Sequence, residues 1–253
     1  MVHCRLSALG HVVGGAEVVV RALFDALGPG GTLVSYTGWQ DAPPDDFDAL
    51  DGEERCSYLE EQPVYDPRVA LTRRDHGRVP ELLRTWPGAL HSGHPEAGVA
   101  AVGAHAGEIT ASHPYDDAYG AGTPYARVVE FGGQVVMLGA PLDTVTLVHH
   151  AEAIAEVPDK RRVVYRYPVL EGDERVWRTF SDIDTSDGAL PYERLIGEED
   201  YVEHLARLAL AAGCGTSGPV GDATAYLFDA PELVEYTVGW IEHNFSSGAS
   251  EDR

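Results

Sequence analysis

Residues 131–154 constrain the fold of this chain more than any other stretch. A Gly-Gly turn at residues 132–133 leads into a short apolar run of strand length that ends at Gly139. Pro141 then marks a turn, and Asp143 stands where a helix N-cap belongs. Apolar side chains follow at helical spacing, at Leu147, Val148, Ala151 and Ile154. The stretch therefore predicts a strand, a turn and a helix.

Two titratable side chains share one face of that helix. His149 and Glu152 are three residues apart, so they lie one above the other close to the helix N-terminus. His150 points roughly a quarter turn away. A histidine and a carboxylate held together on a rigid element form a candidate acid–base pair. The alternative is that His149 is a core residue, which is the commoner role of a lone helix histidine.

A family resemblance enters at this stretch. Residues 138–152 read Leu-Gly-Ala-Pro-Leu-Asp-Thr-Val-Thr-Leu-Val-His-His-Ala-Glu, which resembles the signature of the aminoglycoside 3-N-acetyltransferase family. Members of that family carry a histidine followed three residues later by glutamate. Further blocks resemble the family in the same order, at residues 36–41, 83–87, 182–187 and 220–228. The similarity thus extends over nearly the whole chain.

The fold expected from the pattern is α/β, with helices on both faces of a sheet, because strands and helices alternate along the chain. Pattern alone leaves an ordinary doubly wound sheet open. The resemblance implies the three-layer α/β/α sandwich of the 3-N-acetyltransferases, which differs from the GNAT fold. With 253 residues and no linker or internal repeat, we expect one domain over residues 1–253. Residues 246–253 have the composition of a disordered tail. At the other end, family members usually have a further helix before the point that corresponds to Met1, so we expect a shortened N-terminus.

The charge balance limits the partners. Asp and Glu number 41 against 18 Lys and Arg, a net charge of −23, which argues against nucleic acid or an anionic membrane and favours a cationic ligand. A solvated acidic surface is the alternative. The three cysteines lack metal or redox spacing, and residues near Met1 contain no signal peptide, so we expect a cytoplasmic protein with free thiols and no metal.

The resemblance implies an acetyl-CoA-dependent transferase that acetylates the 3-amino group of aminoglycosides and gives antibiotic resistance. His149 is the predicted catalytic base, and Glu152 either orients it or holds a substrate ammonium group. We expect direct transfer, because residues 215–218 do not form a Gly-x-Ser-x-Gly elbow and Ser217 reads as a loop residue.

The predicted contacts to acetyl-CoA are Ser92, Thr123 and Thr146. Ser92 lies in a segment similar to one near the cofactor in relatives, although His91 replaces the usual arginine. Thr123 before Pro124 is also a sound helix N-cap, and that role alone would explain it. Arg5 is another departure, because the family has a small hydroxyl residue there.

The predicted substrate contacts are one aromatic residue, Trp39, and four acids, Asp143, Asp182, Asp184 and Asp187. Asp182 and Asp184 alternate along an extended run, so both would face one polyamine. Two other functions remain open: acetylation of another small-molecule amine, and polycation binding without catalysis. The expected assembly is a monomer or homodimer.

Overall fold

The computed structural model describes residues 1–44 and 47–246. Its strands are β1 (Val2–Cys4), β2 (Thr32–Tyr36), β3 (Leu90–His91), β4 (Val99–Gly103), β5 (Gln134–Leu138), β6 (Arg162–Glu171), β7 (Glu174–Ile183), β8 (Gly215–Val220) and β9 (Ala223–Asp229). Its helices are α1 (Gly15–Leu27), α2 (Gly52–Glu61), α3 (Arg78–Arg84), α4 (Ala106–Thr110), α5 (Pro124–Glu130), α6 (Leu147–Ile154), α7 (Glu193–Ile196), α8 (Tyr201–Ala211) and α9 (Ala230–Phe245). The predicted tail lies, from residue 247 on, outside the described residues.

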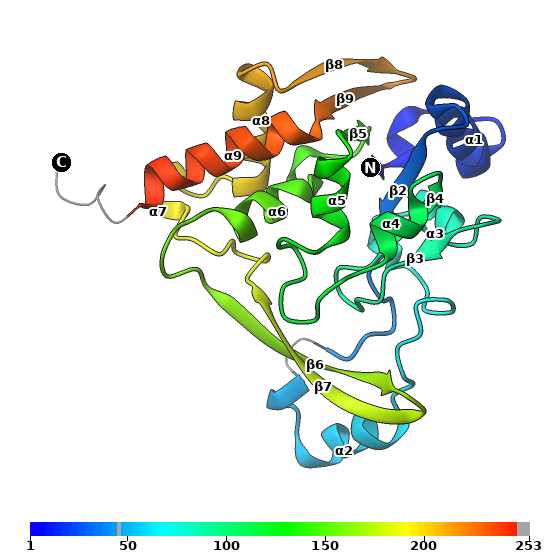
Figure 1. Ribbon diagram of the computed structural model, residues 1–253, viewed down its shortest axis with the longest axis vertical. Coiled ribbons are helices and arrows are strands. Elements are labelled where there is room, and N and C mark those ends of the chain that lie inside the picture. The colour runs from blue at the N-terminus through cyan, green and yellow to red at the C-terminus, as the bar shows by residue number, and fades with distance from the viewer. Residues whose placement is uncertain (45–46, 247–253) are drawn as a thin grey trace.

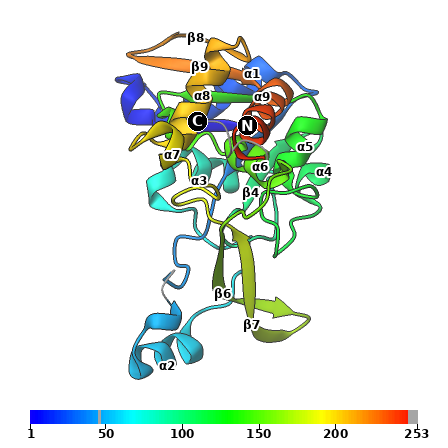
Figure 2. The same cartoon turned by 90° about the vertical axis from the view of Figure 1, so that its left-hand side faces the viewer.

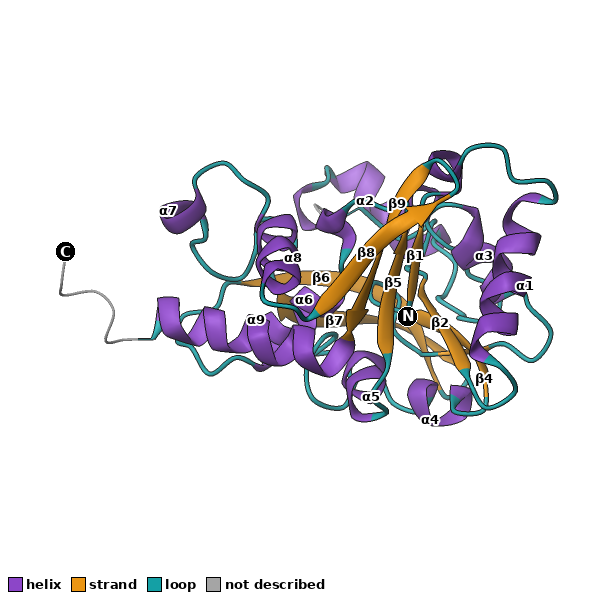
Figure 3. Cartoon of the chain, turned by 90° about the horizontal axis from the view of Figure 1, so that it is seen from above, coloured by secondary structure: helices purple, strands orange, loops and turns teal. Residues whose placement is uncertain are grey.

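The central layer combines two sheets that lie side by side. One has the strand order β1-β5-β9-β8 and the other the order β2-β4-β3. Strand β1 pairs in parallel with β5, and the other ladders of these two sheets are antiparallel. The Ser35 hydroxyl of β2 donates to the Val2 carbonyl of β1 over 3.4 Å. Seen from above, the strands form one twisted layer (Figure 3).

Helices cover both faces of this layer because apolar residues alternate along the strands. On β5, Val135 and Met137 join the core cluster that contains α4, α5, α6, α8 and α9. Val136 and Leu138 face the opposite cluster, which contains α1 and α3. Side chains in a strand point alternately to the two faces, so one apolar strand serves two cores. The expected α/β fold with helices on both faces is confirmed (Figure 3).

The turn between β5 and α6 differs from the prediction. Gly139 has φ +64°, and a Cβ there would lie 2.9 Å from the Ala8 Cβ, so the turn requires glycine. A 3-10 turn at Leu142–Thr144 follows, and α6 begins only at Leu147. Asp143 is therefore an exposed turn residue, and its prediction as N-cap was wrong. The β-branched run at residues 144–146 disfavours an earlier helix start.

The hairpin of β6 and β7 extends away from the layers toward α2 (Figures 1 and 2). Its two-residue turn consists of Gly172 and Asp173. Phe47 stacks on Trp177 at 4.8 Å between ring centroids, and Arg175 donates to the carbonyls of Glu60 and Tyr58. The segment that contains α2 is thus attached to the hairpin by these contacts.

Two elements form where the local sequence pattern is weak. Helix α2 lies in an acid-rich segment, and the Asp51 carboxylate caps it by accepting from the amides of Glu53 and Glu54. Strand β8 includes Ser217, which was expected in a loop. No helix of the described residues is long and apolar enough to cross a membrane.

Candidate functional site

A cavity of about 900 Å³ lies between β1, β2, the segment before α3 and the start of α6. Its wall carries imidazole, phenol, hydroxyl and guanidinium groups from residues far apart in sequence. Its polar side chains include His3, Arg5, Tyr36, Asp75, His76, Arg78, Tyr119, Thr146, His149 and Thr185. Of the predicted site residues, the cavity brings together His149 and Thr146.

One ring nitrogen of His149, Nδ1, lies close to two groups of the protein. Its Nδ1 lies 3.1 Å from the Tyr201 hydroxyl and 3.9 Å from Glu152 Oε2. The ring edge also packs against Tyr119, with 5.3 Å between centroids. Its side chain is 15% exposed, at the cavity wall. With Nδ1 engaged, Nε2 is the nitrogen left to accept a proton from a reactant.

Glu152 is fully buried below His149. Its Oε1 accepts from the Ala189 amide over 2.6 Å, and its Oε2 lies 3.4 Å from the Tyr201 hydroxyl. Because the carboxylate does not line the cavity, its geometry favours orienting His149 over holding a substrate ammonium group.

His150 faces the interior. Its Nδ1–H donates to the Tyr119 carbonyl over 2.6 Å, and burial lowers the pKa of its imidazole. This hydrogen bond holds the backbone of Tyr119, whose side chain lines the cavity. The predicted divergence of the two neighbouring histidines is therefore seen in the structure.

Two predicted cofactor contacts lie away from the cavity. Ser92 is buried, accepts from the Val99 amide and contacts His113 Nδ1 at 2.8 Å. Thr123 is buried and caps α5, where its hydroxyl accepts from the Ala126 amide. Both side chains therefore make hydrogen bonds within the protein. Of the three predicted contacts to acetyl-CoA, Thr146 is the one that lines the cavity.

The predicted substrate contacts are dispersed. Trp39 is buried against Tyr65, with 5.4 Å between ring centroids. Asp143 is exposed on its turn outside the cavity. Asp184 and Asp187 flank Thr185, which lines the cavity. These two acids thus lie next to the site, whereas Trp39 and Asp143 do not contribute to the wall of the cavity.

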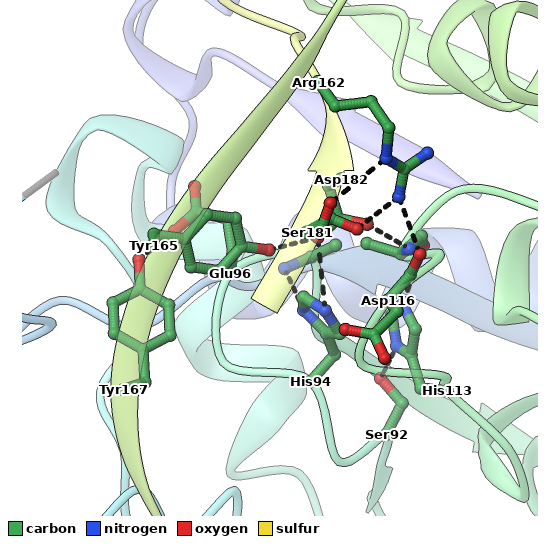
Figure 4. A network of polar contacts seen from close by, with 12 residues as sticks. Ser92, His94, Glu96, His113, Asp116, Arg162, Tyr165, Tyr167, Ser181 and Asp182 are labelled. Carbon is green, nitrogen blue, oxygen red and sulfur yellow. Dashed lines mark hydrogen bonds and ion pairs between the residues drawn. The ribbon is translucent and has the colours of Figure 1, made fainter. Parts of the chain in front are cut away.

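Asp182 belongs to a buried polar network instead (Figure 4). Its carboxylate accepts from the Ala118 amide over 2.6 Å and from the Tyr165 hydroxyl. His94 Nε2 lies 3.7 Å away, and burial lowers the pKa of His94 well below its usual value. Neutral His94 does not form an ion pair with Asp182. Both oxygens of the carboxylate are therefore engaged by partners within the protein.

The network also includes His113, whose two ring nitrogens are assigned by their partners (Figure 4). Nε2–H donates to the Ala118 carbonyl over 2.8 Å, so Nδ1 accepts from the Ser92 hydroxyl. Both polar groups of Ala118 are therefore fixed, directly before the cavity residue Tyr119. The network supports the loop that carries one wall of the site.

Charges of opposite sign gather on the two sides of His149. Arg5 and Arg78 line the cavity, a notable concentration of cations in a chain with a net charge of −23. A second, smaller pocket of about 390 Å³ lies beyond Tyr201 and has an acidic wall. Its acids are Asp187, Glu193, Glu198, Glu199 and Asp200. Within residues 1–44 and 47–246, no group of three or more His, Cys, Asp or Glu is placed to hold a metal ion.

Sequence reasoning missed several residues of this site. Tyr36 and Thr185 stand inside blocks that carry the family resemblance, which was the available signal. Tyr119, His76 and Tyr201 have no local signal, because only the folded chain brings them to His149 or to its cavity.

Comparison with known proteins agrees with this geometry. Residues 1–242 match the family model described as aminoglycoside 3-N-acetyltransferase. The chain is 48% identical, over 98% of its length and 87% of the relative, to aminoglycoside N(3)-acetyltransferase VIII of Streptomyces fradiae.

Two solved structures are similar over most of both chains. The crystal structure of aminoglycoside acetyltransferase AAC(3)-Xa has a TM-score of 0.95 and 46% identity, covering 97% of this chain and 87% of that one. AAC-IIIb in a binary complex with CoASH has a TM-score of 0.88 and 39% identity, covering 98% and 90%. The chain therefore belongs to the aminoglycoside 3-N-acetyltransferase family.

Proposed function

We propose that this protein transfers the acetyl group of acetyl-CoA to the 3-amino group of an aminoglycoside in one direct step. The observation that carries the proposal is His149, which lines the large cavity while Tyr201 and Glu152 hold it from behind. An imidazole held in this position can act as a general base toward a reactant in the cavity. The name of the Streptomyces fradiae relative supports the choice of the 3-amino group.

The cavity fits acetyl-CoA in size and charge. Its volume of about 900 Å³ lies near the upper end of ordinary ligand sites. Arg5 and Arg78 offer cations for phosphate groups, and Gly15 at the start of α1 brings a helix N-terminus to the same wall. The CoASH complex of AAC-IIIb supports this co-substrate. We propose that Thr146 contacts it as well, because its side chain lies one helical turn before His149.

Acetyl-CoA supplies a thioester carbonyl as the electrophile. As the amine attacks, the new C–N bond forms and His149 Nε2 takes the proton that the amine loses, while Glu152 stabilises the imidazolium. The thioester C–S bond then breaks, and the leaving CoA thiolate takes up that proton to depart as the free thiol. Neighbouring hydroxyl groups of Tyr119 and Thr146 are available as donors near the reacting groups. Burial raises the pKa of the Tyr119 phenol, which keeps it a neutral donor.

A covalent acetyl-enzyme is disfavoured at this cavity. Cys4 lines it, but burial raises the pKa of its thiol to about 11. A thiol that remains protonated at neutral pH is a poor nucleophile. Direct attack by the amine needs only the base that His149 provides.

The acidic side of the site is proposed to receive the polycation. Asp184 and Asp187 lie on either side of Thr185, and Asp187 also lines the second pocket. Carboxylates spaced along one turn suit a ligand that carries several ammonium groups. The net charge of −23 adds a long-range attraction for such a ligand.

Release of CoA thiol tests the function. With acetyl-CoA and tobramycin, we expect release that depends on both compounds, and a product acetylated at the 3-amino group by NMR. Release with other small amines but not with tobramycin would favour the alternative transferase. Tobramycin binding without any thiol release would favour a polycation-binding protein.

We also propose that the reaction takes place in the cytoplasm, since the described cysteines Cys4, Cys56 and Cys214 are all free thiols. A monomer or a homodimer remains the expected assembly. Light scattering of the purified protein distinguishes the two.

A further inference from the structure

His3 lies in the middle of β1 and lines the large cavity. Its neighbours Val2 and Cys4 belong to the core cluster that contains α1 and α3, so His3 projects from the opposite face of the strand. The backbone of β1 is fixed on both sides. It pairs with β5, where His3 is opposite Met137, and the Ser35 hydroxyl of β2 donates to the Val2 carbonyl. A rigid strand therefore holds this imidazole at the cavity wall.

The two ring nitrogens of His3 have different surroundings. Nε2 is buried and has no hydrogen-bond partner among residues 1–44 and 47–246. The side chain as a whole is half-buried, and Nδ1 is the nitrogen on its accessible part. Unsatisfied buried N–H groups are rarer in proteins than unsatisfied acceptors, so the proton of the neutral ring is favoured on Nδ1. His3 thus presents an N–H donor to the cavity.

The imidazole of His3 is neutral at every pH at which His149 could act as a base. Burial lowers the pKa of His3 from 6.5 to about 3, and the charges of the amino terminus, His76 and His149 act in the same direction. A ring with this pKa does not take up protons near neutrality. Its N–H can still act as an electrophile that polarises a carbonyl group.

The surroundings of His3 connect it with both ends of the bound acetyl-CoA. Arg5, one of the cations proposed for the phosphate groups, follows two residues later, about 7 Å along the chain. His149, the proposed base, is near enough for its charge to affect the pKa of His3. In a direct transfer, the thioester carbon must lie beside the amine that His149 deprotonates. His3 and the reacting carbonyl group therefore adjoin the same part of the cavity.

We propose that His3 is a catalytic residue whose Nδ1–H donates a hydrogen bond to the thioester carbonyl oxygen of acetyl-CoA. The inference rests on the proposed function. As the C–N bond forms, the carbonyl oxygen takes up the electron pair of the C=O double bond, and the hydrogen bond to the resulting oxyanion strengthens. When the C–S bond breaks, that electron pair re-forms the carbonyl group. The proton stays on Nδ1 throughout.

Acetyl-CoA labelled with ¹³C at the thioester carbonyl tests the contact in the absence of any acceptor amine. A hydrogen bond to the carbonyl oxygen moves its ¹³C signal downfield, so the bound signal should lie downfield of free acetyl-CoA. His3→Leu should abolish this shift. In His3→Asn the side-chain amide N–H takes the position of Nδ1–H and should keep most of it.

Kinetics with tobramycin test the catalytic role. His3→Leu should lose about 10²–10³-fold in kcat, with KM for both substrates within about twofold, and His3→Asn should stay within about tenfold of the wild type. The loss in His3→Leu should be the same factor throughout the range from about pH 6 to 9, because a group with a pKa of about 3 does not titrate there.

His91→Leu is the matched control. His91 is also half-buried on a strand, but it lies outside the cavity and contacts the Arg84 carbonyl, so this variant should keep wild-type kcat. Four results would overturn the proposal: no downfield shift in the wild type, unchanged kcat in His3→Leu, a loss in His3→Asn as large as in His3→Leu, or equal losses in His3→Leu and His91→Leu. A shifted carbonyl signal in a wild type that releases no thiol with tobramycin would refute the proposed function and leave the His3 contact standing.

Discussion

His149 and His150 are neighbours in sequence, yet their environments separate a reactive imidazole from a structural one. His149 is 15% exposed at the cavity, whereas His150 is 3% exposed and bonded to the Tyr119 carbonyl. A helix advances about 100° per residue, so adjacent side chains cannot share one environment. His150→Ala would therefore leave a buried gap, and it is unsuitable as a control for His149.

Glu152→Gln tests whether the Glu152 carboxylate orients His149. Gln can still accept from the Ala189 amide, but its NH₂ then faces Tyr201 and favours the wrong tautomer of His149. We expect kcat to fall by roughly 10²-fold or more with little change in KM for either substrate. Steady-state kinetics check this. A rise in the aminoglycoside KM at unchanged kcat would instead make Glu152 a substrate contact.

Asp184→Asn tests the proposed substrate turn. Asp184 Oδ1 accepts from the amides of Ser186 and Asp187, and an asparagine oxygen can keep both bonds while the charge is lost. KM for an aminoglycoside should rise by the equivalent of about 1.5–3 kcal/mol, and KM for acetyl-CoA should stay unchanged. Equal effects on the two substrates would indicate a structural role for the turn.

At the scale of elements, the buried network joins the β6–β7 hairpin to the loop before α5. Asp182 of β7 accepts from the Ala118 amide, and Ala118 precedes the cavity residue Tyr119. Removing the carboxylate leaves a buried amide and a half-buried phenol without their acceptor. The hairpin thereby contributes to the geometry of a site that it does not line.

Asp182→Ala should therefore lower the free energy of unfolding by roughly 2–4 kcal/mol, measured by urea denaturation. Thr179→Ala, an exposed position on the same strand, is the control and should cost less than about 1 kcal/mol. If Asp182→Ala had wild-type stability and a raised aminoglycoside KM, Asp182 would be a substrate contact and not a structural residue.

Elements with a strong local pattern could be predicted from sequence. Helix α1, the Gly172-Asp173 hairpin and α9 follow from caps, periodicity and turn residues. Strand β8 could not, because its Gly-Thr-Ser-Gly-Pro-Val sequence has low β-propensity and only pairing with β9 extends it.

At the scale of the whole molecule, the site depends on distant segments that no local pattern connects. His149 and Glu152 were predictable because one helix carries both. Tyr201 and Tyr119 were not, because α8 and the 118–120 loop meet α6 only in the folded chain. Asp182 was assigned to the substrate from its alternation with Asp184, but alternation does not reveal which face a neighbouring loop covers.

Buried neutral histidines make the stability of the whole protein depend on pH. Burial lowers the pKa of His113 from 6.5 to about 4, and it lowers that of His94 as well. Between these values the unfolded chain binds more protons than the folded one, so stability is complete above about pH 6.5 and is lost as the pH falls toward 4. For His113 the loss is on the order of 2–3 kcal/mol.

Urea denaturation at several pH values between about 7 and 4 measures this slope. His113→Asn should flatten it, whereas His105→Gln should not, because His105 is exposed on the surface. A slope unchanged by His113→Asn would show that other groups cause the acid sensitivity.

The kcat of His149→Gln for acetyl transfer tests the central claim most directly. Thiol release is followed with acetyl-CoA and tobramycin for the wild type, His149→Gln and the surface control His105→Gln. If Nε2 of His149 is the base, His149→Gln should lose about 10²–10⁴-fold in kcat. The control should match the wild type. A wild-type kcat in His149→Gln would contradict the catalytic role assigned to α6.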